Sequence, residues 1–106
     1  MATNPWKKAV NLAVANTIYN LNTLMLALDA SAPTTCTELT LQIDPEWAGT
    51  YMRVGNSDVS FLMWGDKLVP GQGAQNQTRY NNCATRQIYL VADAANCVVG
   101  VSALQG

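Results

Sequence analysis

The sequence predicts an all-β protein, an antiparallel β-sandwich of jelly-roll-like form with one short helix. Three observations predict it. Several segments alternate between apolar and polar residues, turn-forming Gly, Pro, Asn and Asp separate them, and helical periodicity is confined to one short segment. The chain of 106 residues has the size of one domain. We expect an N-terminal arm over residues 1–8 and a single sandwich domain over residues 9–106.

The first predicted strand lies in KAVNLAVAN, residues 8–16. Val10, Leu12 and Val14 fall on one side of an extended chain, as in a half-buried strand. The alternative is one helix over residues 5–29. We prefer a strand followed by a short helix because the Asn and Thr residues of that span are poor helix formers.

The predicted helix follows in YNLNTLMLALDASAP. An Asn near position 20 caps its start and Pro33 stops it. Its apolar face is formed by residues at helical spacing: Leu21, Leu24, Met25 and Leu28.

Three predicted strands and a loop occupy the middle of the chain. CTELTLQID, residues 36–44, alternates clearly, while residues 50–54 and 59–64 are predicted to form a hairpin around the turn GNSD. The following Gly-, Asn- and Gln-rich segment, residues 65–87, is predicted to be mostly a long loop or an irregular strand.

The end of the chain, IYLVADAANCVVGVSAL, predicts two strands joined in a hairpin by the turn DAAN. Val98 and Leu104 fall on the face opposite Cys97, Val99 and Val101. A strand that is apolar on both faces is typically buried on both, so the Val98 face is a candidate interface. Gly100 leaves room on that face for another backbone.

The composition favours a subunit of an assembly. Hydrophobic residues make up 49% of the chain and charged residues only 12%, with a net charge of −1. A surface of neutral amides and hydroxyls loses its water at lower cost than a charged one. The charge argues against nucleic acid as a partner, and we expect no membrane partner because no apolar stretch is long enough to span a bilayer.

No catalytic chemistry stands out. The chain has no histidine, its carboxylates fall mostly at predicted turns, and no Gly-rich phosphate loop or metal-ligand spacing occurs. We therefore expect no enzyme activity, cofactor or metal. The three cysteines, Cys36, Cys83 and Cys97, are expected as buried free thiols in a protein made in a reducing cytoplasm, with one bridge such as Cys36–Cys97 left open.

Large apolar side chains in or beside turns supply further candidates for an interface. Core packing is the competing interpretation, favoured for Tyr51 and Phe61. Trp6 would anchor the N-terminal arm on a neighbour. The candidate interface residues are Trp6, Trp47, Phe61, Met63, Trp64, Val98 and Leu104.

The order of several motifs resembles a known family. TLQIDPEWAGTYMRVGNSDVS, then GDKLVPGQG, then IYLVADAANCVVGVSAL is similar to the small β-sandwich virion proteins of tailed bacteriophages, and ANTIYNLNTLMLALD resembles a stretch that such chains often carry. The similarity covers about residues 9–104. SFLMWGDKL and AQNQTRYNN depart from the family pattern.

The resemblance implies a structural protein of the virion. It favours a head decoration (cement) protein that binds the outside of the major capsid protein lattice as a homo-oligomer, with a trimer favoured by shell symmetry. The localisation would be the capsid surface, after synthesis in the bacterial cytoplasm. The alternatives are a head–tail connector, neck or head-fibre base subunit, and a carbohydrate-binding module that uses Trp47, Trp64 and the amide-rich residues 72–82.

Overall fold

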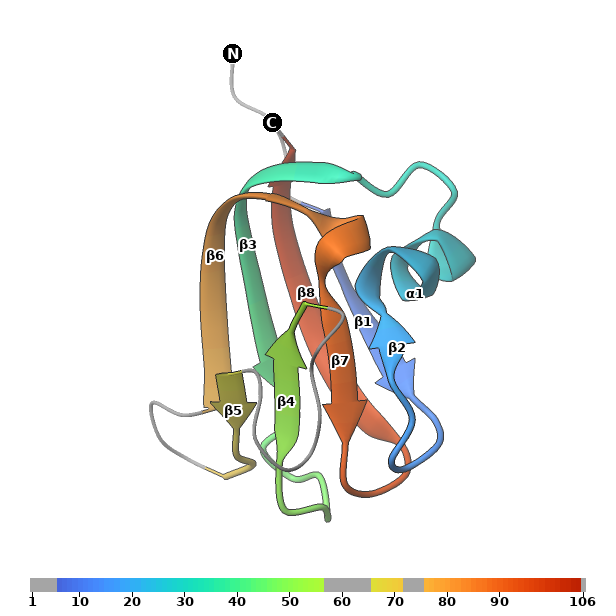
Figure 1. Cartoon of the computed structure of the whole chain (residues 1–106), viewed down its shortest axis with the longest axis vertical. Helices are drawn as coiled ribbons and strands as arrows, with labels where there is room; N and C mark the ends of the chain where they lie inside the picture. The colour runs from blue at the N-terminus through green and yellow to red at the C-terminus, as the bar shows by residue number, and fades with distance from the viewer. Residues whose placement is uncertain (1–5, 57–65, 72–75, 106) are drawn as a thin grey trace.

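Two four-stranded antiparallel sheets face each other in the computed structural model, which describes residues 6–56, 66–71 and 76–105 (Figure 1). Sheet A has the order β1 (Trp6–Leu12), β8 (Cys97–Gln105), β3 (Thr35–Ile43) and β6 (Gln77–Ala84). Sheet B has the order β2 (Tyr19–Asn20), β7 (Tyr89–Ala92), β4 (Met52–Gly55) and β5 (Asp66–Leu68). The predicted fold class, an all-β antiparallel sandwich with one short helix, is confirmed.

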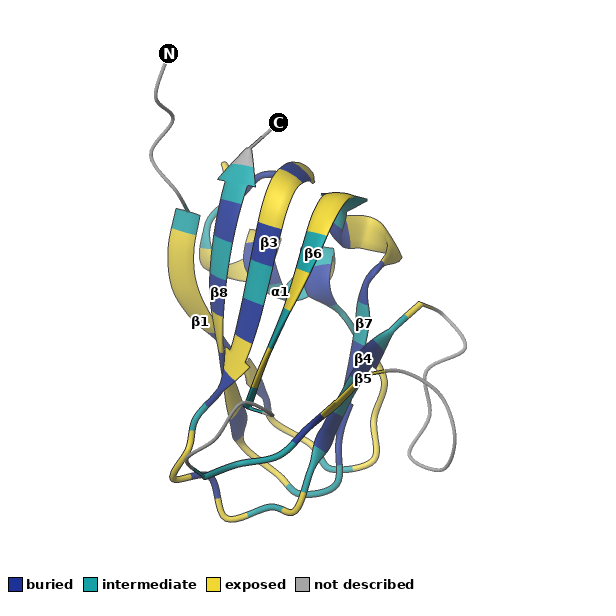
Figure 2. Cartoon of the chain, turned by 90° about the vertical axis from the view of Figure 1, so that its left-hand side faces the viewer, coloured by how far each residue is buried: buried dark blue, intermediate teal, exposed yellow. Residues whose placement is uncertain are grey.

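The core lies between the inner faces of the two sheets. Along β3 and β8, buried residues alternate with exposed or half-buried ones, as Figure 2 shows in side view. This is the pattern that one-sided burial imposes on a pleated strand. The inner face of sheet A carries Val10, Leu12, Leu39, Leu41, Ile43, Cys97, Val99, Val101 and Ala103, and that of sheet B carries Met52, Val54, Leu68, Leu90 and Ala92.

Helix α1 (Leu21–Leu28) covers the side of the sandwich where β1 and β2 are the edge strands (Figure 1). Its N-cap is Asn20, whose side chain accepts a hydrogen bond from the Thr23 backbone amide at 3.1 Å. Leu21 and Met25 are fully buried against the core. The predicted helix and cap are confirmed, and the alternative of one helix over residues 5–29 is wrong.

The opposite side of the sandwich lies between β5 and β6, where no helix covers the described residues. A 3₁₀ helix, η2 (Thr85–Gln87), carries the chain from β6 across to β7. Thr85 is completely buried, and its hydroxyl donates to Asn22 Oδ1 at 3.0 Å. This bond ties the crossover to α1.

The beginning of the chain corrects two expectations. Strand β1 starts at Trp6, so residues 6–8 belong to the sheet and not to an arm; residues 1–5 lie outside the described part. The strand also ends at Leu12, opposite Cys97, so Val14 lies beyond the pairing and is 56% exposed. The alternation of Val14 with Leu12 was therefore misleading.

The predicted C-terminal hairpin is wrong in its pairing, although both strands exist. β7 lies in sheet B beside β2 and β4, while β8 lies in sheet A beside β1 and β3. The DAAN segment is thus a corner between the two sheets. Long-range bonds hold it: Asp93 Oδ1 accepts from the Thr50 and Tyr51 amides at 2.9 and 3.2 Å, and the Trp47 indole donates to Ala95 O at 3.1 Å.

The segment 65–87, predicted to be mostly a long loop or an irregular strand, contains regular structure. β5 pairs with β4, and β6 pairs with β3 over its whole length. The predicted strand 59–64 and its hairpin lie outside the described residues. In the part of the chain that the structure describes, no helix has the length and hydropathy needed to cross a bilayer.

Candidate interaction surfaces

The outer face of sheet A is exposed and nearly free of charge along its central strand β8. Val98, Gly100, Ser102 and Leu104 point outward there, and Val98 is 38% exposed while Leu104 is half-buried. The predicted division of β8 into two faces is therefore confirmed. Charged residues of this face lie on the other strands: Lys7 on β1, and Glu38 paired with Arg79 at 3.8 Å.

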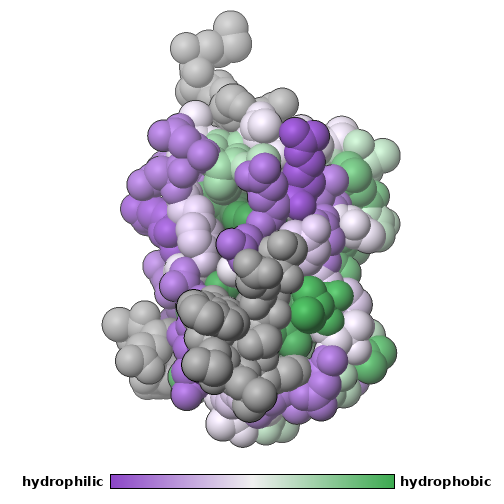
Figure 3. All heavy atoms as spheres, in the orientation of Figure 1, coloured by the Kyte–Doolittle hydropathy of each residue, from purple (hydrophilic) through white to green (hydrophobic). Residues whose placement is uncertain are grey.

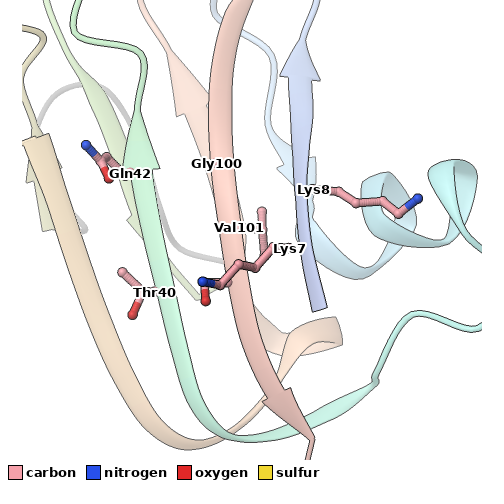
Figure 4. Close-up of a pocket in the computed structure, with 7 residues that line it drawn as sticks. Lys7, Lys8, Thr40, Gln42, Gly100 and Val101 are labelled. Carbon is pink, nitrogen blue, oxygen red and sulfur yellow. The ribbon is translucent and has the colours of Figure 1, made fainter. Parts of the chain in front are cut away.

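Gly100 forms the floor of a groove in this face. Gly100 pairs with Ala9 of β1 on one side and with Gln42 of β3 on the other. At this level of the sheet, the only large side chain on the three strands is therefore the Gln42 amide. The groove has a volume of about 390 Å³ and is also lined by Lys7, Thr40 and Ser102. In Figure 4 the Lys7 side chain reaches along this face, whereas Lys8 points away toward α1.

A second group of large apolar side chains is exposed on one continuous stretch of the sequence, which runs from the turn after β1 through α1. Four of the five exposed large apolar residues among those described lie between positions 14 and 28: Val14, Ile18, Leu26 and Leu28. We call these four residues the apolar edge. Figure 3 shows green surface over α1 and over the region of β2. The sequence between Lys8 and Asp29 contains no charged residue.

The sequence patterns concealed the apolar edge. Val14 and Leu28 were both expected on core-facing sides, and both are at least half exposed, at 56% and 50%. Leu28 is the last residue of a two-turn helix of which only Leu21 and Met25 are fully buried. The useful signal was the length of the uncharged stretch, because a surface helix normally carries charges on its outer side.

Trp6 is held within this chain. Its indole Nε1 donates to Asp29 Oδ2 at 3.0 Å, and the ring packs against the core while remaining partly exposed. Asp29 also accepts from the Ser31 hydroxyl at 2.7 Å and the Ser31 amide at 2.9 Å. The hydrogen bond from the Ser31 hydroxyl, then that from Trp6 and then that from the Ser31 amide lower the pKa of Asp29 from 3.8 to about 2. The expected role of Trp6 as the anchor of an arm gives way to a link between β1 and the end of α1.

Trp47 is buried, with 9% of its surface exposed, so the expected exposure of its ring in a turn is wrong. The chain folds the ring back over Gly49, where any Cβ would overlap the ring. The indole nitrogen is satisfied by Ala95 O. Trp47 thus fastens the 44–50 connection to the corner after β7 and offers little surface to a partner.

The remaining candidates divide between surface and undescribed residues. Val98 and Leu104 lie on the outer face of sheet A. Phe61, Met63 and Trp64 lie outside the described residues. Tyr51, expected in the core, is half-buried instead: the Lys67 ammonium lies 4.9 Å and the Arg53 guanidinium 5.4 Å from its ring centre.

Within the described ranges, no cluster of three Cys, Asp or Glu side chains is placed to hold a metal ion. The three cysteines are free thiols. Burial raises the pKa of Cys97 to about 12 and that of Cys36 to about 11, so both thiols are protonated in the folded protein at neutral pH.

Comparison of the chain with known protein families, with curated proteins and with solved structures finds no match.

Proposed function

We propose that this chain is a non-enzymatic structural protein of a tailed-phage virion, a decoration protein that binds the outside of the major capsid protein lattice and stabilises the shell. The motif resemblance supports the virion class. The apolar edge supports the docking role and is the observation that carries it. Four large apolar side chains exposed on an uncharged segment are costly in water and are typical of a surface that another protein covers.

Two separate surfaces suit a subunit that must contact both a shell and its own neighbours. The outer face of sheet A and helix α1, which carries Leu26 and Leu28, lie on different sides of the sandwich, as Figures 1 and 2 together show. In the proposal the apolar edge binds the capsid protein and the neutral β8 face packs against a second copy in a trimer. Many weakly bound copies in a symmetric array then act as a strong clamp.

The decisive experiment measures where the protein is in the particle and how many copies are present. Virions of the phage that encodes the chain are separated by density gradient, and the protein is quantified against the capsid protein. A decoration protein co-sediments with heads in a number that follows the capsid lattice, and heads stripped of it release DNA at a lower temperature. A copy number that fits one ring indicates a neck or fibre-base subunit instead, and absence from virions contradicts the whole proposal.

A charge placed in the apolar edge tests the docking surface. The Ile18→Asp variant should rebind stripped heads at least about tenfold more weakly, because the buried side chain contributes more than about 1.5 kcal/mol and a carboxylate must be desolvated. Gln77→Glu is the matched control: it adds one negative charge to β6, the edge strand of sheet A opposite β1, where its register partner Gln42 is neutral. Equal rebinding of both variants, with circular dichroism showing both folded, assigns docking to another surface.

A further inference from the structure

Two of the three cysteines lie directly opposite each other in sheet A. Cys36 on β3 is the register partner of Cys83 on β6. Opposed residues of an antiparallel pair have Cα atoms about 4.5 or 5.5 Å apart, and both spacings fall in the range of about 4.4 to 6.8 Å that a disulfide spans. Both cysteines lie on the inner side of the sheet, and Cys83 is among the groups that raise the pKa of Cys36, after its burial, so the two thiols interact.

Matched irregularities in the two strands produce this arrangement. Leu39 and Cys36 are both buried although they lie three residues apart, and strict alternation would put them on opposite faces. The pairing of β3 with β8 shifts register between Cys36 and Glu38. On β6, Asn82 has a φ of 51°, a left-handed conformation that Asn tolerates better than most residues. Together these changes bring both thiols to the inner side of the sheet.

The pair can be reached from solvent on the side of Cys83. Cys36 is buried at 3% exposure, whereas Cys83 is half-buried. Cys83 lines a pocket of about 240 Å³ together with Gly55, Tyr80, Ala84 and Ile88. A small disulfide reagent that enters this pocket meets the Cys83 sulfur first and has Cys36 behind it.

We propose that Cys36 and Cys83 form an oxidation site, in which a low-molecular-weight disulfide such as oxidised glutathione converts the two thiols into a cross-strand disulfide between β3 and β6. The Cys83 thiolate attacks one sulfur of the glutathione disulfide, whose S–S bond breaks and releases one glutathione. The Cys36 thiolate then attacks the Cys83 sulfur and releases the second glutathione. Two electrons pass from the cysteine pair to the glutathione disulfide, and the two thiol protons end on the two glutathiones.

Cys97 is excluded from this chemistry by its position. Cys36 pairs with Gln105 of β8, and Cys97 lies at the other end of that strand, opposite Leu12. Eight residues of strand at about 3.3 Å each place the two cysteines roughly 26 Å apart, far beyond the reach of a disulfide. The bridge between Cys36 and Cys97 left open by the sequence is therefore ruled out in this fold.

The bridge would fasten an edge strand. Within sheet A, β6 pairs only with β3, and in the described residues its link to sheet B includes a hydrogen bond from the Tyr80 hydroxyl to Asp66. A disulfide between residues 36 and 83 closes a loop of about 48 residues, which restricts the unfolded chain substantially. We expect the melting temperature to rise by about 5–15 °C on oxidation and to return on reduction.

The test treats the purified full chain with oxidised glutathione at about pH 8.5, where more of each thiol is ionised, and then alkylates the remaining free thiols. Peptide mass spectrometry should find a Cys36–Cys83 linkage and an alkylated Cys97. Cys97→Ser should oxidise like wild type. Cys83→Ser should form no linkage, and Cys36→Ser should stop at the mixed disulfide of Cys83 with glutathione.

Three results would overturn the inference. These are a wild-type protein that stops at the mixed disulfide, a linkage that involves Cys97, and a linkage found only between two chains on a non-reducing gel. Because Cys36→Ser alters a buried position, its melting temperature is compared with that of Cys83→Ser under reducing conditions. If the Cys36→Ser variant does not fold, the Cys83→Ser and wild-type results decide the outcome alone.

Discussion

Single residues determine the conformation of the segments that connect the strands. Trp47 and Gly49 act as one unit in the connection after β3, because the ring occupies the space that a side chain at position 49 would need. The indole then reaches the corner after β7 through its bond to Ala95 O. One small residue therefore determines how a large one joins the two sheets.

Replacing Gly49 should displace the Trp47 ring. We expect Gly49→Ala to lower the free energy of unfolding by about 1–3 kcal/mol, the usual cost of overpacking. Gly100→Ala is the control, since its Cβ would meet only Gln42 O at an ordinary 3.6 Å. Urea denaturation of both variants checks the prediction, and a Gly49→Ala variant as stable as Gly100→Ala would disprove it.

Asp29 makes the fold sensitive to acid. Its pKa is lower in the folded protein than its ordinary value of 3.8, so ionised Asp29 stabilises the fold above that pH, and the contribution is lost as the pH falls toward about 2. The melting temperature of Asp29→Asn should therefore decrease less than that of wild type between about pH 5 and pH 2.

Ser31→Ala provides the intermediate case for Asp29. It removes the hydroxyl that donates at 2.7 Å, the largest cause of the lowered pKa, and leaves the Trp6 bond in place. The fall in its melting temperature between about pH 5 and pH 2 should lie between those of wild type and Asp29→Asn. Identical pH profiles for all three proteins would show that Asp29 does not couple to folding.

At the scale of elements, the sequence predicts best where burial is one-sided and local. Leu39, Leu41 and Ile43 alternate with polar residues because β3 sits centrally in sheet A with a polar outer face. The helix was predictable from Asn20 and the spacing of Leu21 and Met25. In both elements the spacing of the buried residues reveals the type of element and also the face that packs against the core.

Strands and strand pairings were predicted wrongly where burial is not one-sided or where the contacts that decide the structure are not local. β6 is an edge strand whose outer face carries Gln77, Arg79 and Asn81, so its composition matches that of a loop. The pairing of β7 and β8 was wrong because a four-residue connection fits a hairpin or a corner equally well. Two long-range contacts make this connection a corner. Asp93 accepts hydrogen bonds from the Thr50 and Tyr51 amides, 43 and 42 residues earlier. The Trp47 indole donates to Ala95 O, 48 residues later. No local pattern contains those bonds.

The candidate surfaces show the same limit. The outward Val98 and Leu104 were predictable from the alternation of β8, whereas the exposure of Val14 depends on where β1 stops pairing with β8. That end point is a property of the whole sheet.

The start of α1 offers a test of an element. Asn20 caps the helix through Thr23 N and also donates from Nδ2 to Arg86 O at 2.7 Å, which joins α1 to η2. Asn20→Ala should lower the free energy of unfolding by about 1–2 kcal/mol. Asn20→Ser should recover part of this loss, because it keeps a capping oxygen without the second bond.

Asn11→Ala is the control for the cap. Asn11 is exposed on β1 and makes a long 3.5 Å hydrogen bond to Asn96. We expect a change of less than about 0.5 kcal/mol, as for an ordinary surface position. If Asn20→Ala is no more destabilising than Asn11→Ala in urea denaturation, the cap does not contribute to folding.

At the scale of the whole molecule, charge is scarce, and the sequence between Lys8 and Asp29, which contains the apolar edge, has no charged residue. If capsid docking uses this surface, binding should depend little on ionic strength, because salt screens charged contacts and leaves apolar burial intact. Rebinding to stripped heads should therefore change by less than about threefold between about 50 mM and about 500 mM sodium chloride. A steep loss of binding with salt would instead point to the charged outer residues of sheet A, such as Lys7 and Arg79.

The pairing of β1 with β8 has a consequence for synthesis on the ribosome. Trp6 pairs with Ala103, and among the described strands of sheet A β1 pairs with β8 alone. Strand β1 must therefore wait for β8, and this contact joins residues that lie far apart in the sequence, which makes folding slow. During that time the uncharged residues 9–28 are exposed without their sheet. A nascent chain of this kind is expected to depend on ribosome-associated chaperones until residues near 105 have left the exit tunnel.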